Sequence, residues 1–335
     1  MLHSGPVAVV AVVLFLLTWP TQSMMQQPVR RSWRQLDFLG AFLLIAASVL
    51  VVFAFQQAGL RPKSWDTVLF LAPLLVGCLC WCILFAWELF ASHNSIFTIL
   101  PPRLLKRRVY TSTVIITILT GFVNFNAIYG LPLHFQIVNG STPLMAGVSL
   151  LPLLVSAAIG SMLGGLTVIH SFAALLVASG SMALGTGLLS TLSDHHSIQA
   201  RTYGFEVPLG LGVGLSISIS TLLAALQCES QDMAIAQGVI AQARVLGGSI
   251  GIAASTAIVG GLSEKAGTER REVGERAVYA KAFSETMWVC AVVACVALVF
   301  SVGTYQKKTG RTSQASSGAE NNTSTRQESV VEKVV

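Results

Sequence analysis

The stretch LPLHFQIVNGSTPLMAGVSLLP, residues 131–152, places a polar segment between two long apolar ones. Its centre, from His134 to Thr142, contains imidazole, amide and hydroxyl side chains but no formal charge. Asn-Gly is a turn dipeptide, and a chain in a membrane can leave backbone polar groups unpaired only where it meets water. The stretch therefore predicts a hairpin at a membrane surface, between a helix that ends near residue 133 and one that begins near residue 144.

The composition of the chain agrees with a membrane environment. Of its 335 residues, 53% are hydrophobic and only 11% are charged, and the mean hydropathy is +0.69. Soluble domains carry roughly 25% charged residues. Because this chain has too few charges to cover a surface in water, it is predicted to be an integral membrane protein.

Nine segments are apolar and long enough to cross a bilayer, which takes about 20 residues of helix. Glycine is scattered through them, as is usual in membrane helices, and the alternation typical of outer-membrane barrels is missing. We therefore predict an all-α, polytopic membrane bundle of about nine transmembrane helices, followed by a disordered tail over 306–335. The predicted spans are 5–20, 36–57, 68–90, 110–133, 144–168, 171–192, 204–226, 234–262 and 284–305.

Lys and Arg predict the orientation. The loops predicted on one side carry ten of these residues against eight on the other, a weak difference over the whole chain. In the first half, segments 21–35 and 91–109 carry seven, against two in the segment 58–67. The positive-inside rule places the two basic segments in the cytoplasm, together with the C-terminus, and the 131–152 hairpin outside. The net charge of +6 is spread over loops that can face anionic lipid, so it does not indicate nucleic acid.

Two segments keep alternative interpretations. Asn139 begins a glycosylation sequon in an external loop, but the same residues form a tight turn that a transferase would reach poorly. Segment 5–20 is either a membrane span or the core of a signal peptide cut near Ser23. Residues 1–6 contain no Lys or Arg, which favours the span.

Several stretches resemble, in the same order, helices of the fourteen-helix drug:proton antiporters of the major facilitator superfamily, especially the fungal branch. Besides the hairpin, they are QLDFLGAFLLIAASVLVVFAFQQAG (35–59), YGFEVPLGLGVGL (203–215) and AQARVLGGSIGIA (241–253). The resemblance extends from about residue 5 to residue 305. It implies export of small organic compounds, driven by protons, across the plasma membrane or the vacuolar membrane.

The resemblance leaves the first five helices of that family without a counterpart. It implies that 1–20 is the last helix of an N-terminal bundle, that 21–109 is a linker with two extra helices, and that 110–305 is the six-helix C-terminal bundle. We therefore expect a truncated product or an incomplete gene model. Since alternating access needs two bundles around one site, the alternative function is a non-transporting membrane protein with at most an association role.

Ionisable side chains inside the spans are the first functional candidates, because charge is costly in lipid. Arg244 lies about ten residues into the eighth span. It either contacts substrate in an aqueous cleft or is a structural cation paired with Asp232 or Glu229. Glu206 opens the seventh span, as a proton-coupling carboxylate or as an interfacial residue that favours a helix N-terminus.

Polar side chains at the outer part of the fourth span form a second group of candidates. Asn126 and Tyr129 are three residues apart on one helical face, where they line a binding cavity or hydrogen-bond a neighbouring helix. Gln136 lies at the outer end of the same span. His134, expected at the edge of the loop, either titrates near neutral pH or is an ordinary hydrogen-bonding residue.

The sequence contains no catalytic triad, HExxH motif or phosphate loop. Cys78 and Cys82 share a helical face but Cys80 points away, so all six cysteines are interpreted as apolar packing residues. We expect no enzymatic activity, no cofactor, no metal site and no nucleic-acid partner. The expected partners are a small-molecule substrate, protons and the lipid bilayer.

Overall fold

The computed structural model describes residues 12–15, 37–60, 67–93, 102–167, 170–192, 200–228, 232–268 and 275–304, and there the chain forms α-helices joined by short turns. Only residues 12–15 of the predicted span 5–20 are among these, and they are helical. The rest of that span and the predicted tail 306–335 lie outside the described residues.

Eight spans among the described residues are long and apolar enough to cross a membrane. The prediction of an all-α, polytopic membrane bundle is therefore confirmed. A short helix, α4 (Pro102–Leu105), precedes the fourth predicted span. The other helices are α2 (Phe38–Leu60), α3 (Val68–His93), α5 (Arg108–Ile137), α6 (Pro143–Ser149), α7 (Leu151–Leu166), α8 (Ser171–Leu189), α9 (Ala200–Gln227), α10 (Met233–Thr268) and α11 (Glu275–Val302).

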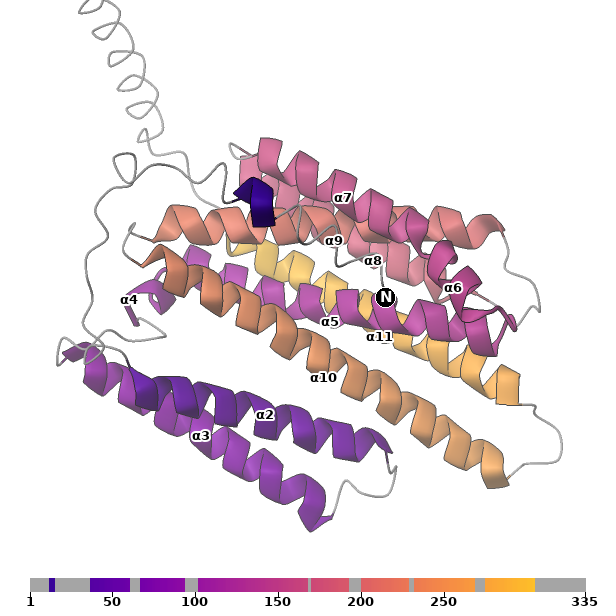
Figure 1. The fold of residues 1–335 in the computed structure, drawn as a ribbon, viewed down its shortest axis with the longest axis horizontal. Helices are drawn as coiled ribbons and strands as arrows, with labels where there is room; N and C mark the ends of the chain where they lie inside the picture. Colours follow the sequence, from indigo (N-terminus) through magenta and orange to yellow (C-terminus); the bar gives the residue numbers. More distant parts are fainter. Residues whose placement is uncertain are drawn as a thin grey trace, which may run out of the picture.

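The long helices run roughly along a common direction (Figure 1). Helix α9 is the most buried span; it packs closely against α7 and α8, and also touches α5 and α10. Helix α5 pairs with α10, and α11 packs on α8 and α5. The main hydrophobic cluster joins α5, α7, α8, α9 and α11 through buried side chains, among them Leu131, Phe135, Met182, Leu209 and Met287.

Helices α2 and α3 form a separate pair beside α10, at one side of the molecule (Figure 1). Asp37 precedes α2, and its Oδ1 atom accepts hydrogen bonds from the Gly40 N–H group at 2.7 Å and from Trp87 Nε1 of α3 at 2.9 Å. The carboxylate thus caps the start of α2, as Asp commonly does at a helix N-terminus. It also fastens α2 to α3 at that end of the pair.

The predicted single span 144–168 consists of two helices, α6 and α7, which meet at Leu150. Pro152 lies in the first turn of α7, where its missing N–H group is tolerated, whereas inside a continuous helix it would remove a hydrogen bond. The Leu150 N–H group instead closes the end of α6 by donating to the Gly147 carbonyl oxygen at 3.3 Å. The proline therefore interrupts the span.

Four helices extend at least four residues beyond the predicted limits. Helix α5 continues to Ile137, α9 begins at Ala200, α10 continues to Thr268, and α11 begins at Glu275 rather than near residue 284. The early start of α11 was missed because Arg276 and Lys281 interrupt the apolar pattern before residue 284. Both side chains are exposed, so the helix can carry them.

Candidate functional site

Glu206 is a fully buried carboxylate in the second turn of α9. Its exposed fraction is 0%, and neither carboxyl oxygen has a hydrogen-bond partner among the described residues. Burying a lone charge is costly unless the group is paired, so such a residue in a membrane helix is a functional candidate. Helix α9 begins six residues earlier, at Ala200, so Glu206 does not open the helix, and its role as a proton-coupling or an interfacial residue stays a prediction.

The close packing of α9 on α7 positions Glu206. Gly210 lies one turn further along α9 on the same face, and a Cβ atom there would collide with the Leu153 carbonyl oxygen and the Ser156 hydroxyl of α7. A residue without a side chain lets the two backbones approach this closely. Glu206 consequently faces the first turn of α7, where the backbone of Leu153 is a neighbouring polar group.

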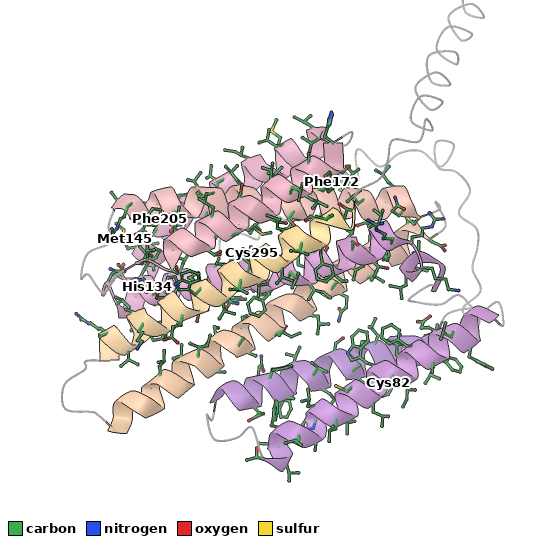
Figure 2. All side chains as sticks on the ribbon, turned by 180° about the vertical axis from the view of Figure 1, so that it is seen from behind. Cys82, His134, Met145, Phe172, Phe205 and Cys295 are labelled. Carbon is green, nitrogen blue, oxygen red and sulfur yellow. The ribbon has the colours of Figure 1, made fainter. Side chains whose placement is uncertain are left out.

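His134 lies within the last turn of α5. The sequence pattern predicts it at the edge of the loop instead. Only 2% of it is exposed, and its ring packs on Phe283 of α11 with centroids 4.4 Å apart. Its Nδ1 atom is buried and has no hydrogen-bond partner in the described part of the chain. Figure 2 shows His134 at the same end of the bundle as Phe205, the residue that precedes Glu206.

Asn126 and Tyr129 do not share one surface. Asn126 is 2% exposed, packs against Gly251 of α10, and donates a hydrogen bond from Nδ2 to the Phe122 carbonyl oxygen of its own helix at 2.9 Å. Tyr129 is 59% exposed. The amide therefore lies in a helix–helix contact without bonding across it, while the phenol faces the surroundings of the bundle. Gln136 is half-buried near the outer end of α5.

Arg244 lies where α10 crosses α5. Added Cβ atoms would collide with the Arg244 carbonyl oxygen at Gly121 and with the Ile118 carbonyl oxygen at Gly247, so the two helices touch through their backbones. The half-buried guanidinium has two buried nitrogen atoms, Nε and Nη2, without a hydrogen-bond partner among the described residues. The expected partner Asp232 forms no ion pair with it there, and Glu229 lies outside the described residues.

The hairpin after α5 is a tight turn. Gly140 has a φ of 68°, in the left-handed region that glycine adopts readily. The Ser141 N–H group donates to the Phe135 carbonyl oxygen at 3.0 Å, and the Thr142 hydroxyl caps α6 by accepting from the Met145 N–H group at 3.3 Å. The turn interpretation of Asn-Gly fits this geometry. Glycosylation of Asn139 stays a prediction.

Two hydroxyl pairs join helices that are far apart in the sequence. Thr120 of α5 and Ser216 of α9 lie 2.7 Å apart, and Ser179 of α8 and Ser301 of α11 lie 3.2 Å apart. All four side chains are buried. Sequence reasoning missed them because Ser and Thr in an apolar span carry no signal of which helix they will meet.

The candidate residues thus occupy separate positions. Glu206 and His134 lie beside the main hydrophobic cluster, at the same end of the bundle, whereas Arg244 lies at the crossing of α5 and α10. The described residues contain no group of three or more His, Cys, Asp or Glu side chains that could hold a metal ion.

Eight apolar helices with a few isolated buried charges define a polytopic integral membrane protein. Comparison with curated proteins shows that the chain is related to fungal MFS-type transporters and efflux pumps, which confirms the resemblance indicated by its sequence motifs. No family model matches the chain.

Three relatives illustrate the similarity. The chain is 29% identical over 236 residues to the MFS-type transporter FPY5 of Fusarium mangiferae, 28% over 247 residues to the efflux pump roqT of Penicillium rubens, and 30% over 264 residues to the MFS-type transporter GME11371 of Pestalotiopsis microspora. These matches cover 69%, 72% and 76% of this chain but 39%, 44% and 47% of the relatives. The chain therefore spans less than half the length of these relatives.

Proposed function

We propose that this protein takes part in the export of small organic compounds across a membrane, coupled to the movement of protons. The names of its relatives, MFS-type transporter and efflux pump, support transport. The proton step rests on Glu206, a carboxylate with no exposed surface and no hydrogen-bond partner among the described residues. A carboxyl group so placed can exchange a proton only when the helices around it separate.

The proposed step uses the contact between α7 and α9. When Glu206 is neutral, the glycine-mediated contact at Gly210 can close over it. When it loses its proton, the charge favours water and N–H donors, and the two helices tend to part at this end. Proton uptake from one side of the membrane and release to the other would then accompany opposite changes in the bundle, as in alternating access.

The substrate side of the proposal involves Arg244. Its guanidinium has unused donors, and such groups bind carboxylates and other polar acceptors strongly where water is scarce. Gln136, Tyr129 and Asn126 are secondary candidates along α5, and His134 is a second candidate for proton exchange. The alternative, a non-transporting membrane protein with an association role, requires none of these groups to change protonation or bind solute.

Transport vesicles test the proposal. Membrane vesicles from cells that express the chain are loaded with a panel of fluorescent lipophilic compounds, and a pH gradient is imposed. Because alternating access needs two bundles around one site, we expect gradient-dependent flux only if two copies of the chain assemble into a working pair. Glu206→Gln should then abolish that flux, and the matched control Glu285→Gln, at an exposed site, should preserve it. Equal flux from the Glu206→Gln and Glu285→Gln variants would show that Glu206 does not carry the proton. Absence of gradient-dependent flux from the unmodified chain would instead favour the association role.

A further inference from the structure

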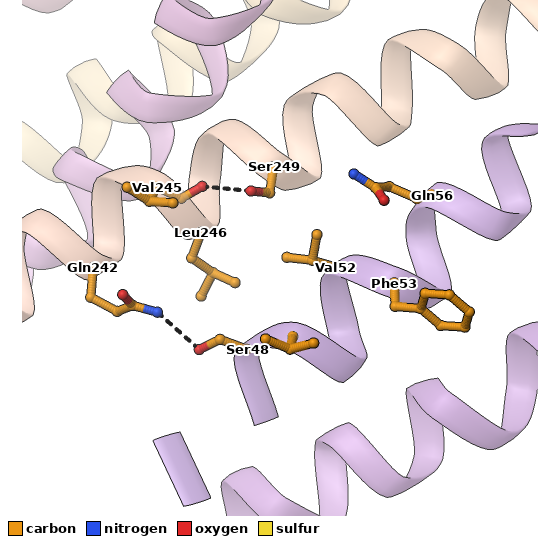
Figure 3. A pocket seen from close by; sticks show the side chains of 9 residues that line it. Ser48, Val52, Phe53, Gln56, Gln242, Val245, Leu246 and Ser249 are labelled. Carbon is orange, nitrogen blue, oxygen red and sulfur yellow. Dashed lines mark hydrogen bonds between the residues drawn. The ribbon is translucent and has the colours of Figure 1, made fainter. Parts of the chain in front are cut away.

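A groove of about 320 Å³ separates α2 from α10 (Figure 3). Its apolar walls are Val49, Val52 and Phe53 on α2 and Val245 and Leu246 on α10. Two of these valines and the phenylalanine follow one face of α2, and β-branched side chains are stiff at χ1. The three valines therefore make part of the groove wall rigid.

Four polar side chains complete the lining, and no lining residue is charged. Gln242 Nε2 donates to Ser48 Oγ at 3.2 Å and closes one end of the groove. Ser249 donates to the Val245 carbonyl oxygen of its own helix at 3.0 Å, which leaves the hydroxyl oxygen able to accept. Gln56, at the other end, makes no side-chain hydrogen bond among the described residues and projects toward α10 (Figure 3).

The groove lies within the part of the protein that crosses the membrane. Ser48 and Gln56 both belong to the apolar span Phe38–Gln57, and Gln56 is next to its end. The distance along α2 between them is about 12 Å at 1.5 Å per residue. The Gln56 side chain is exposed next to the end of this span, so its amide is free to hydrogen-bond a ligand hydroxyl near the membrane surface.

We infer that this groove binds a sterol, with the ring system against the valine walls and the hydroxyl group at the Gln56 amide. The absence of charge in the lining disfavours a phosphate head group, which would attract Lys or Arg. The stiff walls suit a rigid ring system better than a flexible acyl chain, because neither surface must be ordered on binding. The site is separate from Glu206 and Arg244 and does not depend on the proposed transport.

Photolabelling tests the site. The full chain is reconstituted in phosphatidylcholine vesicles with a photoreactive cholesterol analogue, and labelled peptides are mapped by mass spectrometry. Labels should concentrate on the groove faces of α2 and α10, and unmodified cholesterol should compete better than its methyl ether, a diacylglycerol or phosphatidylserine. Filling the groove with Val52→Trp should lower labelling at least tenfold. Val76→Trp, at an exposed position on α3, should leave it unchanged.

A second variant keeps the test decisive if Val52→Trp fails to fold. Gln56→Leu removes the amide at an exposed position, so folding should be retained, as judged by an unchanged gel-filtration profile. Loss of one hydrogen bond should weaken competition by cholesterol about fivefold and abolish its advantage over the methyl ether. Labels spread evenly over α2 and α3, equal competition by diacylglycerol, or no effect of Gln56→Leu would overturn the proposal.

Discussion

The imidazole ring of His134 lies against the phenyl ring of Phe283, with the ring planes inclined at 34°. This contact joins the last turn of α5 to α11, and both side chains are buried. The contact between the two rings stabilises the fold through packing, because the His134 Nδ1 atom makes no hydrogen bond in the described part of the chain.

Truncating the His134 side chain should therefore lower the stability of the folded protein more than replacing its ring nitrogen atoms with carbon. His134→Ala should destabilise the folded protein by about 2 kcal/mol through the cavity left beside Phe283. His134→Phe should be neutral or stabilising, since it keeps an aromatic ring and removes a buried nitrogen atom that lacks a partner. Thermal unfolding of the purified protein in detergent measures both. Equal melting temperatures for the two variants would contradict the packing argument.

Glu206→Gln should raise the melting temperature in detergent relative to the unmodified protein. Glutamine keeps the shape of the side chain but cannot ionise, so it avoids the cost of a lone buried charge. The difference should be larger at alkaline pH than at acidic pH, because only the ionised carboxyl group carries that cost. The exposed control Glu285→Gln should show no such dependence on pH, and the same response from both variants would mean that Glu206 is solvated.

Two glycines of α10 provide a matched pair. Gly247→Ala places a methyl group against the Ile118 carbonyl oxygen of α5 and should destabilise the protein by about 1–3 kcal/mol through overpacking. Gly238→Ala meets no atom within 4 Å and should be neutral or slightly stabilising, because alanine favours the helix. Melting temperatures at the same detergent concentration compare them. A destabilised Gly238→Ala variant would show that glycine matters in α10 for another reason.

The C-terminus is predicted to be cytoplasmic from the distribution of Lys and Arg in the first half of the chain. A protease added to sealed, right-side-out cells should spare an epitope tag placed after Val335 and digest it once the membrane is permeabilised. Digestion of the tag in intact cells would reverse the predicted orientation. A cytoplasmic marker protein that survives in the same sample serves as the control.

Long apolar runs were sufficient to predict the fold class, because a membrane helix must pair its backbone groups within itself wherever it runs. Helix limits were harder. Arg276 and Lys281 concealed the first turns of α11, and Pro152 was not recognised as the start of a second helix in its span. Helix limits of this kind depend on how far a helix continues beyond the apolar layer of the membrane. The hydropathy of the local sequence does not contain that information.

The candidate residues could be named from the sequence but not placed. Glu206 and Arg244 were identified because ionisable groups are rare in apolar spans. The complete burial of Glu206, however, depends on the contact of Gly210 with α7, between residues more than fifty positions apart. The separation of Asn126 from Tyr129 likewise depends on which neighbouring helix covers each side of α5.

The break between α6 and α7 has an electrostatic consequence. A helix that restarts at Leu151 exposes backbone N–H groups in its first turn, and these carry the partial positive charge of the helix N-terminus. Glu206 faces that turn beside Leu153. The interruption at Pro152 thus offers a diffuse positive field to a carboxylate that has no basic side chain beside it in the described structure. This field reduces the cost of a charge at Glu206 without pairing it, so the ionised carboxyl group still gains from water when α7 and α9 part.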